Sequence, residues 1–276
     1  MKAEHIKGVL SSIGKKPTKR LGQNFLLDES VISRQVDFAE ISSEDTVLEI
    51  GPGLGNLTEA ILATGAKVVA VEKDPDFVRF LQKRFGPRLQ LIQADAVKAF
   101  LPEFDKVVSN LPYQISSPIV FKLLEIGFES AVLMLQLEFA ERMVAKPGTQ
   151  EYGRLSVGVY YRADCEILFK VPPSAFWPQP RVDSCVVRLV PKEPPFVVGN
   201  EAFFFEVVRA IFSHRRKKIA NSLASDGPFR RTLSTEVVGN LGSLPYASKR
   251  AEELTPEMMG QLADALLAMT ASNKKD

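Results

Sequence analysis

The sequence has few of the residues that build disulfide-linked or metal-binding proteins. Its 276 residues include only two cysteines, Cys165 and Cys185, and two histidines, His5 and His214. The cysteines show no pairing pattern, so we expect reduced thiols rather than a disulfide. The histidines lie in basic surroundings without the spacing of metal ligands, and the sequence therefore predicts no metal site.

Long hydrophobic runs and a strong net charge are also lacking. No apolar run approaches the roughly 20 residues of a membrane-spanning helix, and no signal peptide opens the chain. The composition, 45% hydrophobic and 25% charged, is typical of a soluble globular protein of one or two domains. The formal net charge is only +2, so binding of a charged partner must depend on local clusters. We expect a cytoplasmic protein with no membrane partner.

A glycine-rich stretch, residues 47–57, organises the chain. It reads VLEIGPGLGNL: an apolar run, an acid and then three glycines at alternate positions. This pattern predicts a strand, a tight turn and a helix, the first βαβ unit of a nucleotide-binding sheet. Gly51 and Gly53 would allow a ligand to approach the backbone closely, since a Cβ would block it. A glycine turn by itself can also hold nothing, so the strands that follow decide its meaning.

Acidic residues follow the next two expected strands, 67–71 and 89–93. Glu72 can accept hydrogen bonds from both ribose hydroxyls of an adenosine, and Asp95 can accept one from the adenine amine. NAD and S-adenosylmethionine (SAM) both contain this adenosine. Glu49, just before the glycines, suits the positively charged SAM better than a pyrophosphate. The strand ends therefore favour SAM as the cofactor.

The fourth expected strand, 106–109, runs into Asn110, Leu111, Pro112 and Tyr113, an Asn-x-Pro-aromatic signature. Methylating an exocyclic base amine is difficult because its lone pair is delocalised into the ring. The Asn110 side-chain carbonyl and a backbone carbonyl beside Pro112 can each accept one amine hydrogen, which directs the lone pair at the sulfonium methyl. Tyr113 offers a stacking face, worth roughly 1–3 kcal/mol by analogy with base–aromatic stacking. The signature predicts methyl transfer to a base amine in nucleic acid.

Together these motifs resemble those of the ribosomal RNA adenine dimethyltransferases, the KsgA family. The matching stretches run from about residue 18 to about residue 260 and are Leu21–Leu26, Glu49–Gly55, Glu72, Asp95-Ala96, Asn110–Tyr113, Leu135–Glu138 and Phe176–Ser184. Gln114 looks more like archaeal and eukaryotic members, because bacterial ones tend to carry Asn there. The resemblance implies an α/β protein, with a Rossmann-like SAM-dependent methyltransferase sheet and a small C-terminal α-helical domain.

The resemblance also implies roles that residue chemistry leaves open. The segment with Gln23, Asn24 and the Leu26 backbone would fold over the cofactor, and Ala96 would belong to the same site. Phe176 matches the family aromatic that faces the Tyr of the Asn-x-Pro-Tyr block across the target base. Two aromatic faces compensate a base for the stacking that it loses when it leaves the RNA stack. The implied substrate is two adjacent adenines in a hairpin near the 3′ end of small-subunit rRNA, free or in the assembling subunit, each methylated twice.

We expect three regions along the chain: a basic flexible N-terminal tail (1–20), a SAM-binding methyltransferase domain (21–190) and a helical, RNA-binding C-terminal domain (191–276). Strands alternating with helices predict a parallel sheet with right-handed crossovers. Residues 164–171 and 184–190 would form an antiparallel pair at its edge. The Pro-rich segment between this pair is expected to lack regular structure.

Two basic clusters are candidate RNA contacts. They consist of Lys15, Lys16, Lys19 and Arg20 in the tail, and of Arg215, Arg216, Lys217 and Lys218 at a helix start. Arg and Lys in such clusters fit a phosphate backbone. Positive charge at a helix start opposes the helix dipole unless an anion is nearby. The alternative for each cluster is a solvated, charged corner.

Two other functional classes stay open. One is a non-catalytic RNA- or DNA-binding module on a methyltransferase fold, against which the intact Asn110–Tyr113 block argues. The other is a DNA adenine methyltransferase, which uses a similar block but also a large target-recognition region that has no counterpart here. NAD-dependent oxidation is a distant third, because nothing resembles a hydride-transfer site. The sequence favours a monomeric SAM-dependent rRNA adenine dimethyltransferase that acts in ribosome biogenesis.

Overall fold

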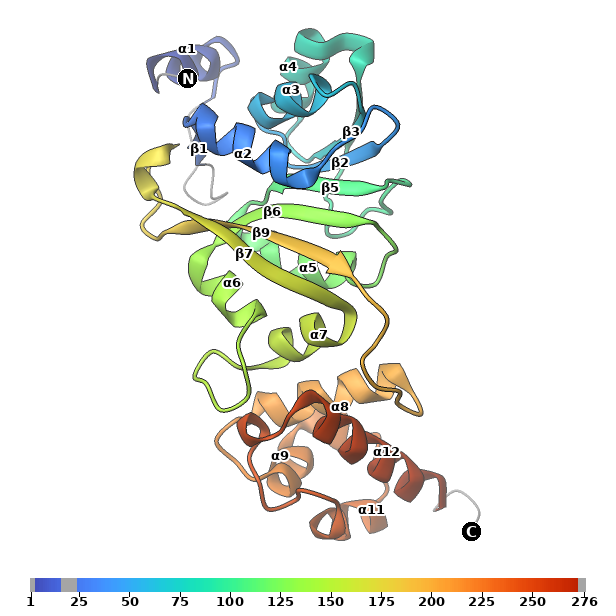
Figure 1. Ribbon diagram of the computed structural model, residues 1–276. Coiled ribbons are helices and arrows are strands. Elements are labelled where there is room, and N and C mark those ends of the chain that lie inside the picture. The colour runs from blue at the N-terminus through green and yellow to red at the C-terminus, as the bar shows by residue number, and fades with distance from the viewer. Residues whose placement is uncertain (1–2, 16–23, 273–276) are drawn as a thin grey trace. The chain divides into compact units, whose positions relative to one another are not determined.

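The computed structural model describes residues 3–15 and 24–272. The chain divides into two compact units, shown in Figure 1. The first comprises Met1–Ala140 and Asp164–Pro191, and the second comprises Glu141–Ala163 and Lys192–Asp276. The chain therefore leaves the first unit twice, whereas the sequence predicted one boundary between the methyltransferase and helical domains, at residue 190. Among the described residues, no helix is long and apolar enough to cross a membrane.

The first unit is built around a seven-stranded sheet with the order β4-β3-β2-β5-β6-β9-β7. Its strands are β2 (Thr46–Ile50), β3 (Lys67–Glu72), β4 (Leu89–Gln93), β5 (Lys106–Asn110), β6 (Ser130–Gln136), β7 (Ala163–Val171) and β9 (Ser184–Pro191). From β4 to β6 all neighbours pair in parallel, and β9 is antiparallel to β6. The strand order reverses between β2 and β5. Open α/β sheets bind their ligands outside the carboxyl ends of the strands at such a switch point.

Helices cover the sheet. Those of the first unit are α1 (Ala3–Ser12), α2 (Glu29–Ala39), α3 (Asn56–Leu62), α4 (Pro75–Phe85) and α5 (Ser116–Leu123), and α6 (Leu137–Met143) begins in this unit and ends in the second. The period-2 alternation of the strands places Val47, Val68 and Val108 in one buried cluster with Ile61 of α3 and Leu81 of α4. α4 starts as its sequence predicts, because Asp74 caps it and proline occupies its first turn.

α1 lies in the segment that we expected to be a flexible tail. Ile6 and Leu10, one helical turn apart, are buried against the rings of Phe25 and Phe77. The lysines of this segment lie beside an apolar stripe formed by Ile6 and Leu10. Residues 3–12 are therefore helical, and burial of the stripe formed by Ile6 and Leu10 stabilises this helix.

The second unit is helical. It contains α7 (Arg154–Arg162), α8 (Glu201–Ser213), α9 (Ile219–Ser225), α10 (Gly227–Arg230), α11 (Thr235–Gly239) and α12 (Pro256–Ser272). Tyr161 of α7 packs its ring against Phe196, Phe204 and Phe205 at centroid distances of 5.0, 5.3 and 5.5 Å. This aromatic contact explains why residues 141–163, which we assigned to the methyltransferase domain from the sequence, belong to the helical unit instead.

Candidate active site

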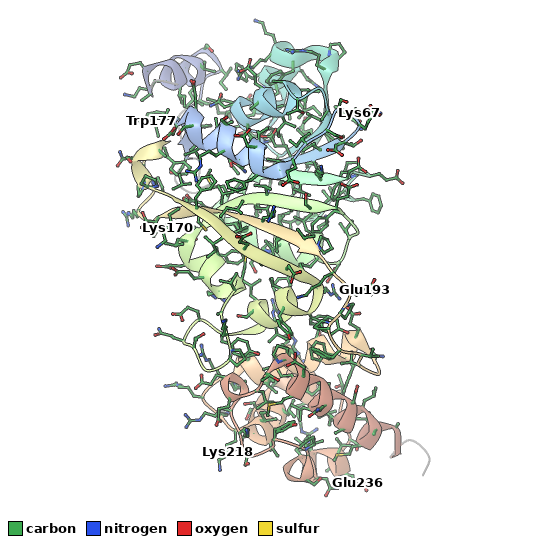
Figure 2. The ribbon with its side chains drawn as sticks, in the orientation of Figure 1. Lys67, Lys170, Trp177, Glu193, Lys218 and Glu236 are labelled. Carbon is green, nitrogen blue, oxygen red and sulfur yellow. The ribbon has the colours of Figure 1, made fainter. Side chains whose placement is uncertain are left out.

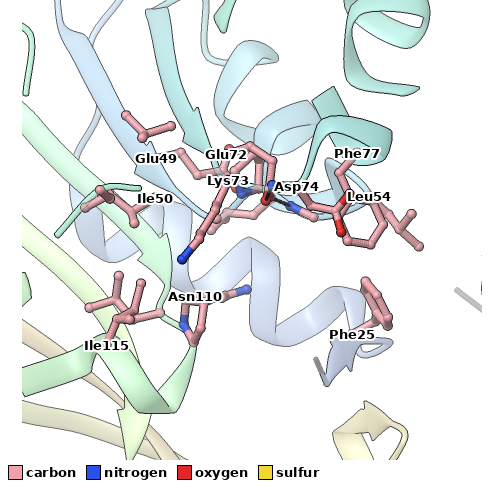
Figure 3. Close-up of a pocket in the computed structure, with 18 of the residues that line it drawn as sticks. Phe25, Glu49, Ile50, Leu54, Glu72, Lys73, Asp74, Phe77, Asn110 and Ile115 are labelled. Carbon is pink, nitrogen blue, oxygen red and sulfur yellow. Dashed lines mark hydrogen bonds between the residues drawn. The ribbon is translucent and has the colours of Figure 1, made fainter. Parts of the chain in front are cut away.

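The carboxyl ends of β2, β3, β4 and β5 open into one cavity of about 460 Å³ (Figure 3). Among its lining residues are Asn24, Leu26, Glu49, Gly51, Gly53, Glu72, Asp95, Ala96, Asn110, Leu111, Pro112, Tyr113 and Phe176. These are all the described residues that the sequence predicted to contact cofactor or base. Gln23 lies outside the described residues. Residues from distant parts of the chain meet here because parallel strands place their carboxyl ends at the same sheet edge.

The glycine turn after β2 uses left-handed backbone conformations. Gly51 has φ +71° and Gly53 has φ +56°, values that residues other than glycine rarely adopt. Gly55, with φ +81°, immediately precedes α3, and a Cβ there would lie 2.9 Å from Leu81 of α4. The first two glycines therefore shape the wall of the cavity, whereas the third permits close packing of the following helices.

Glu72 is fixed at the end of β3. Its carboxylate accepts hydrogen bonds from the backbone N–H of Asp74 at 2.8 Å and of Gly53 at 3.4 Å. Burial raises the pKa of Glu72, and these N–H groups oppose part of that rise. The carboxylate is thus held between the strand end and the glycine turn, where ribose hydroxyls could donate to it.

Glu49 is the most deeply buried acid of the cavity, with 2% of its surface exposed. The Thr58 hydroxyl donates to its carboxylate at 2.6 Å. Burial raises the pKa of Glu49 to about 8, and the nearby carboxylate of Glu72 adds to the rise. A cation in the cavity would favour the ionised forms of both acids. A buried pair of this kind therefore fits a positively charged ligand such as SAM.

Asp95 follows β4 and has a basic neighbour that the sequence analysis missed. Lys73 Nζ lies 3.0 Å from one carboxylate oxygen of Asp95, and the backbone N–H of Val97 donates to the other at 3.1 Å. The hydrogen bond from Lys73 lowers the pKa of Asp95. Since 74% of the Lys73 side chain is exposed, this ion pair is weak enough for a ligand amine to replace it.

Asn110 presents a buried carbonyl to the cavity. It ends β5, and its Oδ1 has no hydrogen-bond partner among the described residues. In the view of Figure 3, Asn110 lies across the cavity from Glu72 and Asp74. The preceding Ser109 fixes this strand end, because its hydroxyl donates to the Ile50 carbonyl at 2.6 Å. A buried acceptor without a partner is costly, so the site suits a ligand that donates to it.

The two predicted stacking rings also line the cavity. Tyr113 starts a 3₁₀ turn (Tyr113–Ile115), and its hydroxyl lies 2.7 Å from the Ser184 hydroxyl. Phe176 belongs to β8 (Phe176–Trp177), which pairs antiparallel with β1 (Phe25–Leu26). The expectation that the Pro-rich segment lacks regular structure is therefore wrong at Phe176–Trp177. This backbone pairing places Leu26, a predicted cofactor residue, opposite Phe176, the ring predicted to face the base.

A family assignment follows from comparison of the chain with known proteins. The model of the family described as "Ribosomal RNA adenine dimethylase" matches residues 14–252. The chain belongs to the ribosomal RNA adenine dimethylase family.

Members of the family from archaea are close in sequence. A protein of Methanosarcina acetivorans named "Probable ribosomal RNA small subunit methyltransferase A" is 50% identical over 246 residues, which cover 88% of this chain and 91% of that protein. One of the same name from Thermococcus gammatolerans is 48% identical, covering 88% and 86%. The archaeal type suggested by Gln114 agrees with these relatives.

Two solved structures support the same assignment. A dimethyladenosine transferase from Plasmodium falciparum superposes with a TM-score of 0.75 at 31% identity, covering 91% of this chain and 98% of that one. The 23S rRNA methyltransferase ErmE superposes with a TM-score of 0.63 at 30% identity, covering 88% and 99%. The Rossmann-like methyltransferase fold with a helical C-terminal part is therefore confirmed.

The basic residues that we predicted as RNA contacts of this family member have diverse environments. Lys16, Lys19 and Arg20 lie outside the described residues. Lys15 forms ion pairs at 2.7 Å with Asp74, a cavity residue, and with Asp76. The structure thus gives Lys15 acidic partners within its own unit. Its charge links the end of the α1 segment to the start of α4.

Arg215 likewise differs from its neighbours in sequence. Its guanidinium donates to the Glu252 carboxylate at 2.6 Å, to the Thr149 carbonyl at 2.8 Å and to the Gln150 carbonyl. These contacts join three segments of the helical unit. The dimethylase resemblance and the charge pattern could not reveal this, because the partners lie far away in the sequence.

The three basic residues after Arg215 lie beside two further basic residues from a distant segment, Lys249 and Arg250. Arg216, Lys217 and Lys218 are exposed, and Figure 2 shows Lys218 at the outer surface of the helical unit. An antiparallel bridge pairs Lys218 with Arg250, and the Ile219 N–H donates to the Lys249 carbonyl at 2.8 Å. We call Arg216, Lys217, Lys218, Lys249 and Arg250 the basic patch.

Proposed function

We propose that this protein is a SAM-dependent rRNA (adenine-N6,N6)-dimethyltransferase. Its substrate would be two adjacent adenines in a hairpin near the 3′ end of small-subunit rRNA. The observation that carries the proposal is the unpartnered, buried Oδ1 of Asn110 in the same cavity as Glu49 and Glu72. The family, and the printed names of the relatives from Methanosarcina and Thermococcus, support the substrate class.

SAM would supply the methyl group from its sulfonium. Glu72 would accept from the ribose hydroxyls, and Asp95 would accept from the adenine amine of the cofactor. Gly51 and Gly53 would allow its close approach, while the buried charge of Glu49 would compensate the cation. We assign Asn24 and the Leu26 backbone to the same site, since both line the cavity.

The target amine would lie at the Asn110 end of the cavity. Asn110 Oδ1 and the backbone carbonyl beside Pro112 would each accept one of its hydrogens. These bonds strengthen as the nitrogen becomes tetrahedral and positively charged, and only such interactions accelerate the chemical step. Tyr113 and Phe176 would hold the base from its two faces. Burial raises the pKa of Tyr113, so the phenol keeps its proton, and we assign it stacking rather than proton abstraction.

The basic patch is our candidate for holding the RNA backbone. Its five side chains are exposed and come from two segments that the Lys218–Arg250 bridge brings together. Clustered Lys and Arg neutralise several phosphates at once, which gives binding that depends strongly on salt. We leave Lys15 and Arg215 out of the patch, because intramolecular ion pairs engage both. We further propose that the protein acts as a monomer in the cytoplasm on the assembling small subunit.

The proposal can be tested with purified protein and labelled SAM. We expect mass mapping to find dimethyladenosine at two adjacent positions of small-subunit rRNA, supplied free or in partly assembled subunits. Large-subunit rRNA is the matched competitor, because ErmE is a 23S rRNA methyltransferase. Methylation confined to large-subunit rRNA would refute the substrate. Binding of SAM and RNA without transfer would favour the non-catalytic module.

A further inference from the structure

Ser184 lies beside the stacking ring of the cavity, but neither the Asn-x-Pro-Tyr chemistry nor the cofactor needs it. Its hydroxyl is 2.7 Å from the Tyr113 hydroxyl, and its side chain is completely buried. The two residues come from different parts of the first unit. Tyr113 follows β5, and Ser184 opens β9. This contact is therefore a product of the tertiary structure.

The two partners differ in how firmly the backbone holds them. Ser184 is opposite Gln136 in the β6–β9 ladder, and the Leu137 N–H donates to the preceding carbonyl, that of Asp183, at 3.0 Å. Tyr113 instead starts a three-residue 3₁₀ turn outside the sheet, closed by a 3.0 Å bond from the Ile115 N–H to the Pro112 carbonyl. A tyrosine ring in a short turn still has two torsions that only side-chain contacts can restrict.

We infer that Ser184 is a positioning residue for methyl transfer, which fixes the orientation of the Tyr113 ring through the bond between their hydroxyl groups. The inference rests on the proposed function, in which the target base stacks on that ring. The bond attaches the outer end of the ring to the first residue of β9, a strand that lies between β6 and β7 in the sheet, so that the ring face is set before the base arrives. A stacking surface that needs no reorientation lowers the entropic cost of holding the base.

The hydroxyl pair acts by geometry and not by charge. Burial keeps the Tyr113 phenol protonated, so the contact is a hydrogen bond between two neutral groups. One such bond has a modest net effect. We therefore expect its loss to slow methyl transfer by roughly 2- to 10-fold, the factor that corresponds to one ordinary hydrogen bond.

The test uses Ser184→Ala, Tyr113→Phe and the double variant of the full chain. Single-turnover methylation of small-subunit rRNA is measured at saturating enzyme and SAM. Each single variant should slow transfer by the same factor, and the double variant should be no slower than either, since both remove the same bond. The affinity for SAM should not change. Tyr113→Phe keeps the ring and removes the same bond by deleting the Tyr113 hydroxyl. Because Tyr113 is only half-buried, the test does not depend on Ser184→Ala folding well.

A spectroscopic readout and a control separate positioning from a merely structural role. RNA with 2-aminopurine in place of the target adenine reports stacking of the base on the ring, and Ser184→Ala should weaken its fluorescence quenching. Leu189→Ala truncates another completely buried β9 side chain, far along the strand, and should leave the quenching unchanged.

The possible outcomes distinguish the inference from the function. If the wild type methylates rRNA and Ser184→Ala is as fast, the inference is overturned. It is also overturned if the losses of Ser184→Ala and Tyr113→Phe multiply. If the wild type does not methylate rRNA in the same assay, it is the proposed function that fails, and the inference falls with it.

Discussion

The cavity at the sheet edge and the basic patch of the helical unit both contain charged side chains, but the two regions hold them differently. In the cavity, Glu49 and Glu72 are buried and receive hydrogen bonds from the surrounding chain. In the patch, Arg216, Lys217 and Lys218 are exposed to solvent. Buried groups act through fixed geometry, whereas exposed charges act through the number of phosphates they neutralise.

This difference also explains where sequence patterns are informative. A residue at the end of a parallel strand has a position dictated by the sheet, so motif spacing locates it. A charge in a run of charges has no such constraint. Arg215 is engaged with Glu252 and two backbone carbonyls, although the next three residues are exposed. The following predictions test the contrast between fixed and exposed groups.

The largest effect should come from Asn110→Ala. If Oδ1 accepts from the target amine, its loss removes an interaction that strengthens in the transition state. By analogy with oxyanion holes, the rate should fall on the order of 10²–10³. Single-turnover transfer at saturating SAM, beside RNA affinity, is the measurement. A near-normal rate would refute the assigned mechanism and favour the non-catalytic module.

The next effect concerns Glu72, which should hold the cofactor ribose. Glu72→Ala should weaken SAM binding by about 1.5–3 kcal/mol, the range for hydrogen bonds to charged groups. Calorimetry on the folded variant measures it. Glu59→Ala, an exposed acid of α3 paired with Arg84, is the matched control and should bind SAM normally. Equal SAM affinity in both variants would exclude Glu72 from the site.

The affinity for SAM should depend on pH, because burial raises the pKa of Glu49. Its pKa of about 8 in the ligand-free protein means that it is protonated at neutral pH. Bound SAM, a cation, favours the carboxylate, so SAM affinity should rise with pH by at most about tenfold per unit and level off above about pH 8. Glu49→Gln should flatten this curve. S-adenosylhomocysteine, which has no sulfonium charge, should show a weaker dependence.

The same group should affect stability in the opposite direction. The pKa of Glu49 is higher in the folded state than in the unfolded chain, so between about pH 4.5 and 8 the folded state binds more protons. The stability of the ligand-free protein should therefore fall as pH rises through this window and change no further above it. Thermal unfolding of Glu49→Gln should lack this component. An identical decline in both proteins would contradict the assignment.

The smallest effects per residue should occur in the basic patch. Replacing Arg216, Lys217 and Lys218 with Ala should reduce the salt dependence of RNA binding by roughly 1 in log–log slope for each lost phosphate contact. SAM affinity should stay the same. Arg215→Ala is the contrasting variant, because it should lower the melting temperature and leave the salt slope almost unchanged. The reverse result would mean that Arg215 contacts RNA and the exposed residues do not.

Much of the first unit could be predicted from the sequence. The strand ranges differ from the structure by a residue or two at their ends, and the predicted cofactor and base residues that the structure describes all line one cavity. Local patterns sufficed because apolar alternation specifies strands, and because the topology of a parallel sheet brings their carboxyl ends together. The identity of the turn residues then specifies the chemistry available at that edge.

Only the tertiary structure decided the contacts between distant segments. It paired Phe25–Leu26 with Phe176–Trp177, placed Ser184 against Tyr113, packed α1 on the cavity wall and assigned residues 141–163 to the helical unit. It also paired Arg215 with Glu252, whereas the three basic residues that follow Arg215 are exposed. No local periodicity in the sequence predicts these contacts. Each depends on which side chains meet after the chain has closed long loops, and that information is distributed over the whole sequence.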